Sequence, residues 1–411
     1  MLSLVQTSEI NRETLQEEEL AVSIHQALRI AMDHNYAIAA WKNVGEVSIN
    51  LIIDTSEYHK VPVIPDLEIL EPGFLVSPFS NESNHLCYLI KSDLHFKGPG
   101  SESLFLQTAR EYSGNAELIR SITEKNPEQN SVYYKNDSDH SADINEAAFK
   151  DLVQKAVDRI KDGAFQKVVP SRRETINLKE NFNLPEVFIA LTKHYPDAFV
   201  SFFSIPEKGT WIGASPEILV EINETGIFRT SAVAGTQPWN RGTDLSSVAW
   251  TQKEIEEQAY VSRYIINSFK KIRLREFEEF GPKTIRAGNL VHLRTDYKVN
   301  LSEVNFPQLG SVMLKLLHPT SAVCGMPKES AAAFLKTYEK YDREFYSGYL
   351  GPVNMENRIA LFVNLRCAQL MHQKAYLYAG AGITSDSNPD KEWRETLIKN
   401  QTIKDILSGG K

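Results

Sequence analysis

Residues 198–222 read AFVSFFSI, PEKG, TWIGA, SP and EILVEI in succession, and this stretch decides the fold class. Three short runs rich in aromatic and branched aliphatic residues follow one another, and each break between them contains proline. Runs of this length and composition, bounded by turn residues, are typical of β-strands. The breaks are too short to hold a helix, so the chain is expected to pass directly from one strand to the next.

Similar runs extend outward from this stretch. Short apolar segments such as SINLIID, FLVSPF and LCYLI fill residues 35 to about 110, and further strands are expected at 288–298, 344–354, 359–370 and 374–380. Helical spacing of apolar residues predicts helices at 16–34, 146–162, 251–271, 306–317, 328–340 and 390–407. The strands come in blocks without regular alternation with helices. This favours an α+β fold with mainly antiparallel sheets over a doubly wound parallel sheet.

The composition excludes several classes of protein. The chain has 411 residues, 42% of them hydrophobic, and its 45 Lys and Arg against 53 Asp and Glu give a formal net charge of -8. This acidity argues against a nucleic-acid-binding protein, because such proteins neutralise phosphates with basic residues. No apolar run reaches the ~20 residues of a membrane span, and the N-terminus lacks the pattern of a secretory signal. Three scattered cysteines form neither a disulfide nor a zinc pattern, so we expect a reduced, cytoplasmic protein.

Two pairs of glutamates are candidates for a site. Glu254 and Glu257 lie three residues apart in one expected helix, and Glu392 and Glu395 repeat the spacing in the last helix. At this spacing both carboxylates of a pair leave the same helix face. The ordinary interpretation is two solvated faces. The alternative is that the two pairs converge on a hard cation such as Mg²⁺, which prefers oxygen ligands.

Three other charged residues stand within or beside apolar runs. Lys167 in FQKVVPSRR either reaches solvent from a strand edge or, if it faces a pocket, serves as a general base. Glu217 is either a carboxylate at a strand end or a general acid. Arg366 in LFVNLRCAQL needs an anionic partner, which is either a structural carboxylate or the carboxylate of a substrate.

The segment AGAGI at 379–383 resembles a dinucleotide loop only superficially, because the third glycine and a directly following helix are missing. Gly380 and Gly382 mark either a tight turn or a close approach of the backbone to an anionic ligand. The polar stretch 121–144, rich in Asn, Ser and Asp, is expected to be a surface loop or linker.

Taken together, the chain resembles the chorismate-utilising enzymes, the family of anthranilate, aminodeoxychorismate, isochorismate and salicylate synthases. Nine segments carry the resemblance in the family order. They are KVVPSR (167–172), IGASPEILV (212–220), AVAGTQPWNRG (232–242), KEIEEQ (253–258), HLRTDY (292–297), LHPTSAVCG (317–325), EFYSGYLGPV (344–353), VNLRCA (363–368) and YAGAGITSDSNPDKEWRETLIK (378–399). The first third of the chain shows no comparable match.

The resemblance implies a magnesium site and a pocket for chorismate. Glu257 and Glu395 would bind Mg²⁺, and Glu254 and Glu392 would hold its waters. The metal would bind the ring carboxylate of chorismate. Other residues would hold the enolpyruvyl carboxylate or line the same pocket, namely Arg366, Tyr346, Gly380, Gly382, Gly235, Thr236, His292, Thr320 and Lys399.

Lys167 decides between the branches of the family. A lysine at this place resembles the water-activating isochorismate and salicylate synthases, since water needs a base before it attacks, whereas ammonia does not. The resemblance implies that Lys167 deprotonates the water that attacks ring carbon 2. Glu217 would protonate the hydroxyl that leaves carbon 4. We therefore expect an isochorismate synthase. The alternatives are a salicylate synthase, an anthranilate or aminodeoxychorismate synthase component, and a non-catalytic chorismate-binding relative.

We expect residues 1–411 to form one unit. Residues 146–405 would be the motif-bearing chorismate-binding region, and residues 1–145 a variable N-terminal part that completes the sheets. The fold implied is a sandwich of large, mainly antiparallel sheets with flanking helices, as in the anthranilate synthase large subunit. The expected partner is chorismate, without nucleic acid or membrane, and a monomer is the expected state.

Overall fold

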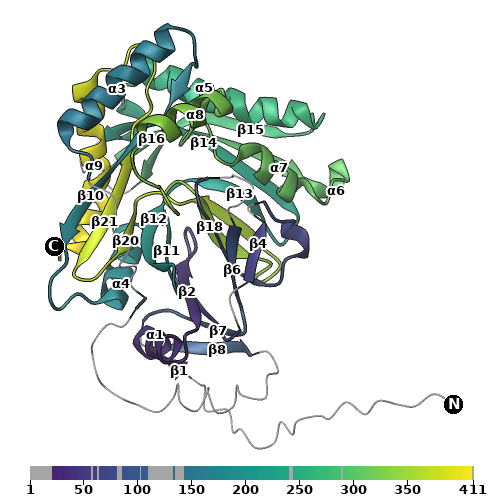
Figure 1. Cartoon of the computed structure of the whole chain (residues 1–411). Coiled ribbons are helices and arrows are strands. Elements are labelled where there is room, and N and C mark those ends of the chain that lie inside the picture. Colours follow the sequence, from purple (N-terminus) through teal and green to yellow (C-terminus); the bar gives the residue numbers. More distant parts are fainter. Residues whose placement is uncertain are drawn as a thin grey trace, which may run out of the picture.

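Two large antiparallel β-sheets lie face to face in this computed structural model (Figure 1). The structure describes residues 21–56, 59–62, 64–80, 86–101, 103–109, 133–134, 143–239, 244–287 and 290–409. Most of the expected loop at 121–144 and residues 16–20 of the first expected helix lie outside these ranges.

The first sheet has ten strands, and all of its pairings between described residues are antiparallel. Its strands in spatial order are β1 (Ala21–Val22), β8 (Leu104–Ala109), β7 (Leu94–Gly98), β3 (Ile49–Asp54), β2 (Ala37–Lys42), β11 (Phe199–Ile205), β12 (Gly209–Ser215), β20 (Cys367–Leu370), β21 (Lys374–Gly380) and β10 (Ser171–Asn177). Strands from the first third of the chain form one half of this sheet, joined to the rest where β2 pairs with β11.

The second sheet has nine strands and is also antiparallel throughout its described pairings. In spatial order they are β15 (Glu278–Ala287), β16 (Leu290–Asn300), β14 (Ile227–Pro238), β13 (Ile218–Ile222), β19 (Ile359–Val363), β18 (Tyr349–Val353), β5 (Gly73–Ser77), β6 (Leu86–Lys91) and β4 (His59–Pro62). Here too an N-terminal strand, β5, pairs with a C-terminal one, β18.

The core between the sheets explains the apolar run from which the fold class was inferred. In β11, Phe199 and Phe203 belong to the inter-sheet core, while Val200 and Phe202 belong to the core on the opposite face of the sheet. Both faces of this strand are buried, so its sequence shows no alternation of polar and apolar residues. Phe199 stacks on Phe362 of β19 in the other sheet with ring centroids 4.1 Å apart. The predicted sandwich of mainly antiparallel sheets is therefore confirmed.

Helices cover the outer faces of both sheets. On the ten-stranded sheet lie α1 (Ile24–Asp33), α4 (Leu184–His194) and the end of α9 (Pro389–Leu407), and on the nine-stranded sheet lie α5 (Gln252–Lys271) and α7 (Leu309–Leu317). A further apolar cluster joins α3 (Glu146–Lys161) and α8 (Lys328–Tyr338), and α6 (Leu301–Val304) is a single short turn. Two 3₁₀ turns lie at Leu67–Ile69 and Leu245–Ser247. Figure 1 shows α3 and α9 side by side along one edge.

Several predicted boundaries need correction. The helices expected at 146–162, 251–271 and 390–407 are confirmed as α3, α5 and α9 within a residue or two. Helix α4 and the edge strand β15 were missed. The run 359–370 is not one strand, because β19 and β20 belong to different sheets and the chain crosses between them at 364–366. This crossing carries Arg366 into the site described below.

A separate two-stranded ladder lies outside both sheets. It pairs β9 (Lys167–Val168) with β17 (Gly325–Met326), and Val168 also bridges to Ile383 on its other side. The chain then passes Pro170 and enters β10 of the ten-stranded sheet. Pro170 donates no backbone hydrogen bond, which suits its place at the junction between two ladders.

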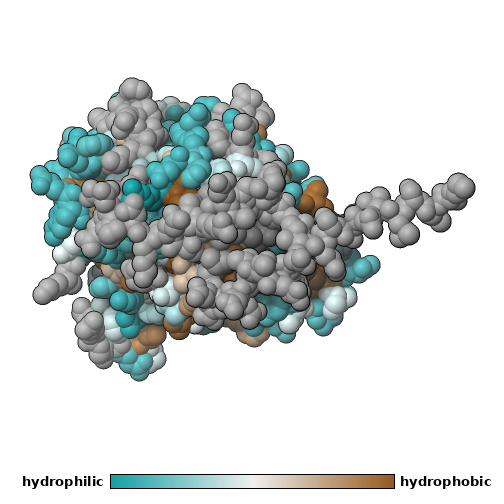
Figure 2. Space-filling view, turned by 90° about the horizontal axis from the view of Figure 1, so that it is seen from below, coloured by the Kyte–Doolittle hydropathy of each residue, from teal (hydrophilic) through white to brown (hydrophobic). Residues whose placement is uncertain are grey.

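The described surface shows no large apolar face. Exposed large apolar side chains such as Val47, Ile69 and Ile255 lie on separate elements. Figure 2 shows the apolar residues of the lower face in small groups among polar ones, where they are not covered by grey atoms. Scattered exposure of this kind is ordinary for soluble folds. None of the described helices is long and apolar enough to cross a membrane. The three cysteines are described and buried, and they form no disulfide with one another.

Candidate active site

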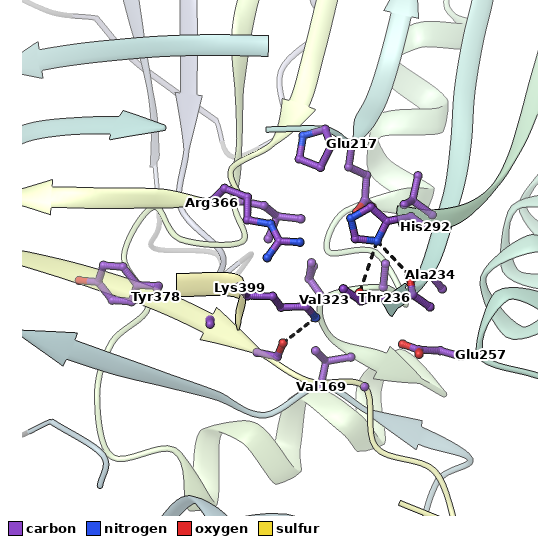
Figure 3. A pocket seen from close by; sticks show the side chains of 18 of the residues that line it. Val169, Glu217, Ala234, Thr236, Glu257, His292, Val323, Arg366, Tyr378 and Lys399 are labelled. Atoms are coloured by element: carbon purple, nitrogen blue, oxygen red, sulfur yellow. Dashed lines mark hydrogen bonds between the residues drawn. The ribbon is translucent and has the colours of Figure 1, made fainter. Parts of the chain in front are cut away.

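A pocket with about 670 Å³ of empty space, part of it open to solvent, lies where strands of both sheets end. Its wall comes from elements far apart in the sequence. The lining residues are Val169, Pro216, Glu217, Val233, Ala234, Gly235, Thr236, Glu257, His292, Ala322, Val323, Tyr346, Leu365, Arg366, Tyr378, Ala379, Gly380, Gly382 and Lys399. In Figure 3, Arg366 and Lys399 extend toward the pocket from one side, and His292 and Glu257 lie on the other.

Glu217 stands at the turn where the chain leaves β12 in one sheet and enters β13 in the other. Its carbonyl accepts from Val363 N at 3.0 Å, and its N–H donates to the Ser215 hydroxyl at 3.4 Å. This hydroxyl in turn donates to Val363 O at 2.5 Å, so both sides of the Glu217 backbone are tied to β19. Burial raises the pKa of Glu217 to about 8, although the positive charges of Lys167, Lys399 and Arg366 oppose the shift. Near neutral pH the carboxyl group therefore carries a proton that it can donate into the pocket.

Arg366 lies at the crossing between β19 and β20 with a positive φ of 49°. Its carbonyl accepts from Ala214 N at 3.1 Å, which anchors the crossing to β12. Burial lowers the pKa of Arg366 to about 10, so the guanidinium stays charged at neutral pH. Its Nη1 atom is buried and has no hydrogen-bond partner among the described residues. A buried cation with an open donor is suited to an anionic ligand.

His292 on β16 presents a neutral ring to the pocket. Burial, together with the charge of Arg366, lowers its pKa to about 3. The Nδ1 atom lies 2.9 Å from Gly235 O and 3.3 Å from the Thr236 hydroxyl. Since a carbonyl only accepts, we assign the proton to Nδ1. Nε2 is then an acceptor, and within the described chain it has no partner. It is suited to a hydroxyl group of a ligand.

Lys167 is placed behind the pocket wall, not on its surface. Its side chain is fully buried, and Nζ lies 3.0 Å from Glu257 Oε1 without hydrogen-bonding geometry to any described residue. Although burial opposes ionisation, the charges of Lys167, Lys253 and Lys399 hold the pKa of Glu257 below its usual value. Of the two groups, Glu257 reaches the pocket, and Lys167 contacts it from the ladder β9–β17.

Gly382 makes room for this ion pair. A Cβ atom at Gly382 would lie 2.1 Å from Glu257 Oε1 and 3.2 Å from Lys167 Cε. A Cβ atom at Gly380 would lie 3.0 Å from Pro170 O and 3.2 Å from the Tyr346 hydroxyl. Neither glycine has a positive φ, so the tight-turn interpretation is not needed. The absence of a Cβ atom at Gly382 leaves room for the side chains of Glu257 and Lys167, and its absence at Gly380 leaves room for the Tyr346 hydroxyl beside the pocket.

The helices α5 and α9, which carry the two glutamate pairs, do meet. Lys253 Nζ of α5 lies 2.5 Å from Glu392 Oε1 of α9. Within α9, Lys399 Nζ lies 2.7 Å from Glu395 Oε1. Burial and the neighbouring Glu395 raise the pKa of Glu392 to about 7. Glu254 instead accepts from Thr251 N at 2.7 Å and from Gln237, as a helix-capping residue.

The glutamates suit magnesium by their chemistry and not by their present arrangement. Their oxygens are hard donors, and Glu392 Oε2 is buried without a partner among the described residues, as an open cation ligand would be. Yet no group of three His, Cys, Asp or Glu side chains in the described ranges is assembled to hold a metal. Lys167, Lys253 and Lys399 instead each contact one carboxylate.

Most of the residues implied by the resemblance line this pocket. Lys167, Glu254, Glu392, Glu395 and Thr320 do not. Thr320 is buried outside the pocket lining, and its carbonyl accepts from Val323 N at 3.1 Å. Lys399 donates to Gly380 O at 2.9 Å and so ties α9 to the end of β21.

Sequence reasoning missed a tyrosine and a lysine at the site, besides apolar lining residues such as Val169 and Val233. Tyr378 lines the pocket and stacks on Tyr346 with ring centroids 5.2 Å apart, and it begins a segment already singled out for its glycines. Lys253 was not considered, although it precedes Glu257 by four residues on the same helix and therefore shares its face. Its pKa is raised, because the charges of Glu392, Glu395 and Glu257 outweigh the effect of burial.

Comparison with known proteins identifies the family of this chain. Residues 100–408 match the model of a family described as chorismate binding enzyme. Isochorismate synthase DhbC of Bacillus subtilis is 30% identical over 270 residues, which cover 62% of this chain and 66% of that protein. The vibriobactin-specific isochorismate synthase of Vibrio cholerae is 27% identical over 261 residues, which cover 62% and 65%. The matched part therefore spans slightly less than two thirds of each relative.

A solved structure shows the same fold over almost the whole chain. MenF, the menaquinone-specific isochorismate synthase of Escherichia coli, superposes with a TM-score of 0.69 at 19% sequence identity, covering 91% of this chain and 89% of that one. The likeness includes the first third of the chain, where no sequence motif was found.

Proposed function

The chain belongs to the chorismate-binding enzymes, and from this premise we propose that it is an isochorismate synthase that converts chorismate to isochorismate with Mg²⁺. The observation that carries the proposal is the pairing of a protonated, buried Glu217 with cationic Arg366 and Lys399 around one pocket. The substrate is a dianion, and a chain of net charge -8 must bind it through such local positive groups.

The chemistry is an exchange of one hydroxyl group for another. Water adds at ring carbon 2 and gives its proton to Lys167, the two ring double bonds shift, and the bond from carbon 4 to its hydroxyl breaks. Glu217 gives its proton to this departing hydroxyl, which leaves as water. The net reaction is an isomerisation, and Lys167 and Glu217 return to their first states by exchanging protons with solvent. Each proton transfer contributes roughly 10²–10⁴-fold to the rate.

Lys167 has to change its contacts to act as the base. It must be uncharged before it accepts a proton, and Glu257 stabilises its ammonium form through the ion pair at 3.0 Å. We therefore place the opening of this pair before the attack of water. Because Gly382 has no side chain, no Cβ atom stands beside the amine stem there; such an atom would lie 3.2 Å from Lys167 Cε.

The other pocket residues bind and orient. Arg366 would hold the enolpyruvyl carboxylate with its open Nη1 donor, assisted by Tyr346. His292 would accept a hydrogen bond from a ring hydroxyl through Nε2. Such positioning is a large part of the rate enhancement where a water has to meet one ring carbon.

Magnesium would be held by Glu257 and Glu395, with Glu254 and Glu392 on its waters, and would supply positive charge to the ring carboxylate. The buried, unpartnered Oε2 of Glu392 supports a cation at this end of α9. Lys253 and Lys399 would then exchange their carboxylate partners. The cytoplasmic location and the monomeric state stay part of the proposal.

Product analysis tests the proposal. Purified protein is incubated with chorismate and Mg²⁺, and the products are separated by liquid chromatography and identified by mass and ultraviolet spectra. We expect isochorismate without pyruvate. Salicylate with one equivalent of pyruvate would establish the salicylate synthase alternative, and an amino product formed with ammonia would establish the anthranilate alternative. Absence of any product from a protein that binds chorismate would indicate the non-catalytic relative.

A further inference from the structure

The strand that carries Lys167 is short and lies outside both large sheets. The ladder β9–β17 consists of two residue pairs, Lys167 with Met326 and Val168 with Gly325. Two further bonds extend it, from Gln166 N to Met326 O at 2.7 Å at one end and from Val169 N to Cys324 O at 2.9 Å at the end toward the pocket. On the other side of β9, Val168 exchanges two backbone hydrogen bonds with Ile383, from Val168 N to Ile383 O at 3.2 Å and from Ile383 N to Val168 O at 2.8 Å. Among the described residues β9 and β17 make no mutual bond beyond Val169, so the pocket end of the ladder depends on another contact.

Arg343 closes the end of this ladder. Its Nη2 donates to Val169 O at 2.7 Å and its Nη1 to Val323 O at 2.9 Å, so one guanidinium bridges both strands beyond their last mutual bond. Val169 and Val323 both line the pocket. The Arg343 carbonyl in turn accepts from Tyr346 N at 2.8 Å. Two parts of the pocket wall, at Val169 and Val323, therefore depend on the placement of one buried side chain, and the backbone of the same residue holds a third.

Glu339 fixes the orientation of that side chain. Its carboxylate accepts from Arg343 Nε at 2.8 Å and from Nη2 at 2.6 Å, and both side chains are buried, with 3% and 5% exposed. The same carboxylate accepts from Ser171 N at 2.6 Å and from the Ser171 hydroxyl at 2.9 Å. Phe79 lies against the guanidinium 4.2 Å from its centre. Each nitrogen of Arg343 donates at least one hydrogen bond, so the group is held rigidly.

We propose that Arg343, oriented by Glu339, is a positioning residue that holds Lys167 in register for proton transfer and does not itself touch the substrate. The planar fork of a guanidinium reaches two carbonyls and a carboxylate at once, whereas a lysine ammonium at this place cannot span them. Misplacement by about 1 Å is sufficient to cost on the order of 10²-fold in rate. The inference rests on the proposed function through the role of Lys167.

The main variant is Arg343→Lys, which keeps the charge and removes the fork. We expect kcat for isochorismate formation, corrected for the folded fraction by circular dichroism, to fall by about 10- to 100-fold. KM for chorismate should stay within about threefold, because the lost interaction acts in the transition state. Hydrogen exchange of the segment 166–170 should become faster than in the wild type. Glu339→Gln is the second variant, with a smaller change in the same directions.

Arg358→Lys is the matched control. Arg358 also donates to two carboxylates, Glu221 at 2.5 Å and Glu46 at 3.1 Å, but it lies outside the pocket. The control should lower the midpoint of urea unfolding and leave kcat unchanged. Arg343→Lys with wild-type kcat, or with a loss of kcat no greater than that of the control, would overturn the proposal. If Arg343→Lys does not fold, the same comparison is made with Glu339→Gln.

The exchange measurement separates this inference from the proposed function. A wild-type protein that forms no isochorismate would refute the proposed function. Faster exchange at 166–170 in Arg343→Lys but not in Arg358→Lys would then still show that Arg343 holds the ladder β9–β17 in place. Unchanged exchange together with unchanged kcat in an active enzyme would refute the positioning role alone.

Discussion

Lys167 Nζ lies 3.0 Å from Glu257 Oε1, with the lysine side chain fully buried. The expected general base therefore contacts an expected magnesium ligand directly. The charge of Lys167 also helps to hold the pKa of Glu257 below its usual value against the effect of burial. A change at either residue should therefore alter both proton transfer and metal binding.

Lys167→Ala tests the base. Isochorismate formation should fall by roughly 10²–10⁴-fold, because water loses its proton acceptor. Lys42→Ala is the matched control, since Lys42 is also buried and donates to Asn43 O at 3.2 Å and Pro196 O at 3.1 Å. The control should be less stable and fully active. Near-wild-type turnover of Lys167→Ala would remove Lys167 as the base.

The raised pKa of Glu217 leads us to expect that turnover depends on pH. Because burial raises its pKa to about 8, the carboxyl group is protonated below that pH and loses its donor function above it. The value of kcat/KM should fall as pH rises through about 8. Glu217→Gln cannot donate the proton, and its kcat should be about 10²–10⁴-fold lower. A wild-type rate that stays flat well above this pH would contradict the assignment.

The raised pKa of Glu217 also leads us to expect that the free energy of unfolding depends on pH. Its pKa is about 8 in the folded state against an ordinary value of 4.5, so between these values the folded state keeps a proton that the unfolded state has lost. The contribution of Glu217 to the free energy of unfolding therefore decreases as pH rises through this window. Glu217→Gln should remove this part of the slope in urea unfolding. An unchanged slope would show that Glu217 is ionised in the folded protein.

Gly382→Ala tests the packing of the ion pair. The added Cβ atom would lie 2.1 Å from Glu257 Oε1, so the carboxylate must move away from Lys167. We expect a loss of roughly 1–3 kcal/mol in the free energy of unfolding and a fall in kcat of at least about tenfold. Gly100→Ala is the control, because no atom lies within 4 Å of its added Cβ. Equal activity of the two variants would be evidence against a functional role of the Lys167–Glu257 contact.

Glu395→Gln tests the metal assignment. Chelation with EDTA should abolish isochorismate formation, and Mg²⁺ should restore it in the wild type but not in Glu395→Gln. Calorimetric titration with Mg²⁺ gives a readout that does not depend on turnover, and here the variant should bind more weakly. Glu329→Gln on the exposed face of α8 serves as control. Retained activity of Glu395→Gln with unchanged Mg²⁺ dependence would refute the assignment.

Local signals predicted much of the fold. Helices α3, α5 and α9 begin at residues that the sequence marks, namely Asn145, the capping pair Thr251 and Glu254, and Asn388 followed by Pro389. Helix α4 was missed because its segment LPEVFIALTKH is short and apolar like the strands around it. Its capping residue Asn183 and Pro185 were the available signals.

What sequence reasoning could not predict depends on contacts between distant segments. Nothing local indicates that the run 359–370 changes sheets, although this crossing points Arg366 into the pocket. The motifs identified most of the lining residues but not that Lys167 lies behind Glu257, or that Lys253 pairs with Glu392. Such pairings are set by the packing of α5 and α9 against the ladder and by no periodicity within either segment.

The most direct test of the account is the reaction of chorismate with the purified protein and Mg²⁺ in water labelled with heavy oxygen. We expect isochorismate that carries one labelled oxygen at carbon 2, while the carbon 4 hydroxyl is lost as unlabelled water. Mass spectrometry of the product measures this. Isochorismate without label, or any product other than isochorismate, would contradict the attack of water on which the roles of Lys167 and Glu217 depend.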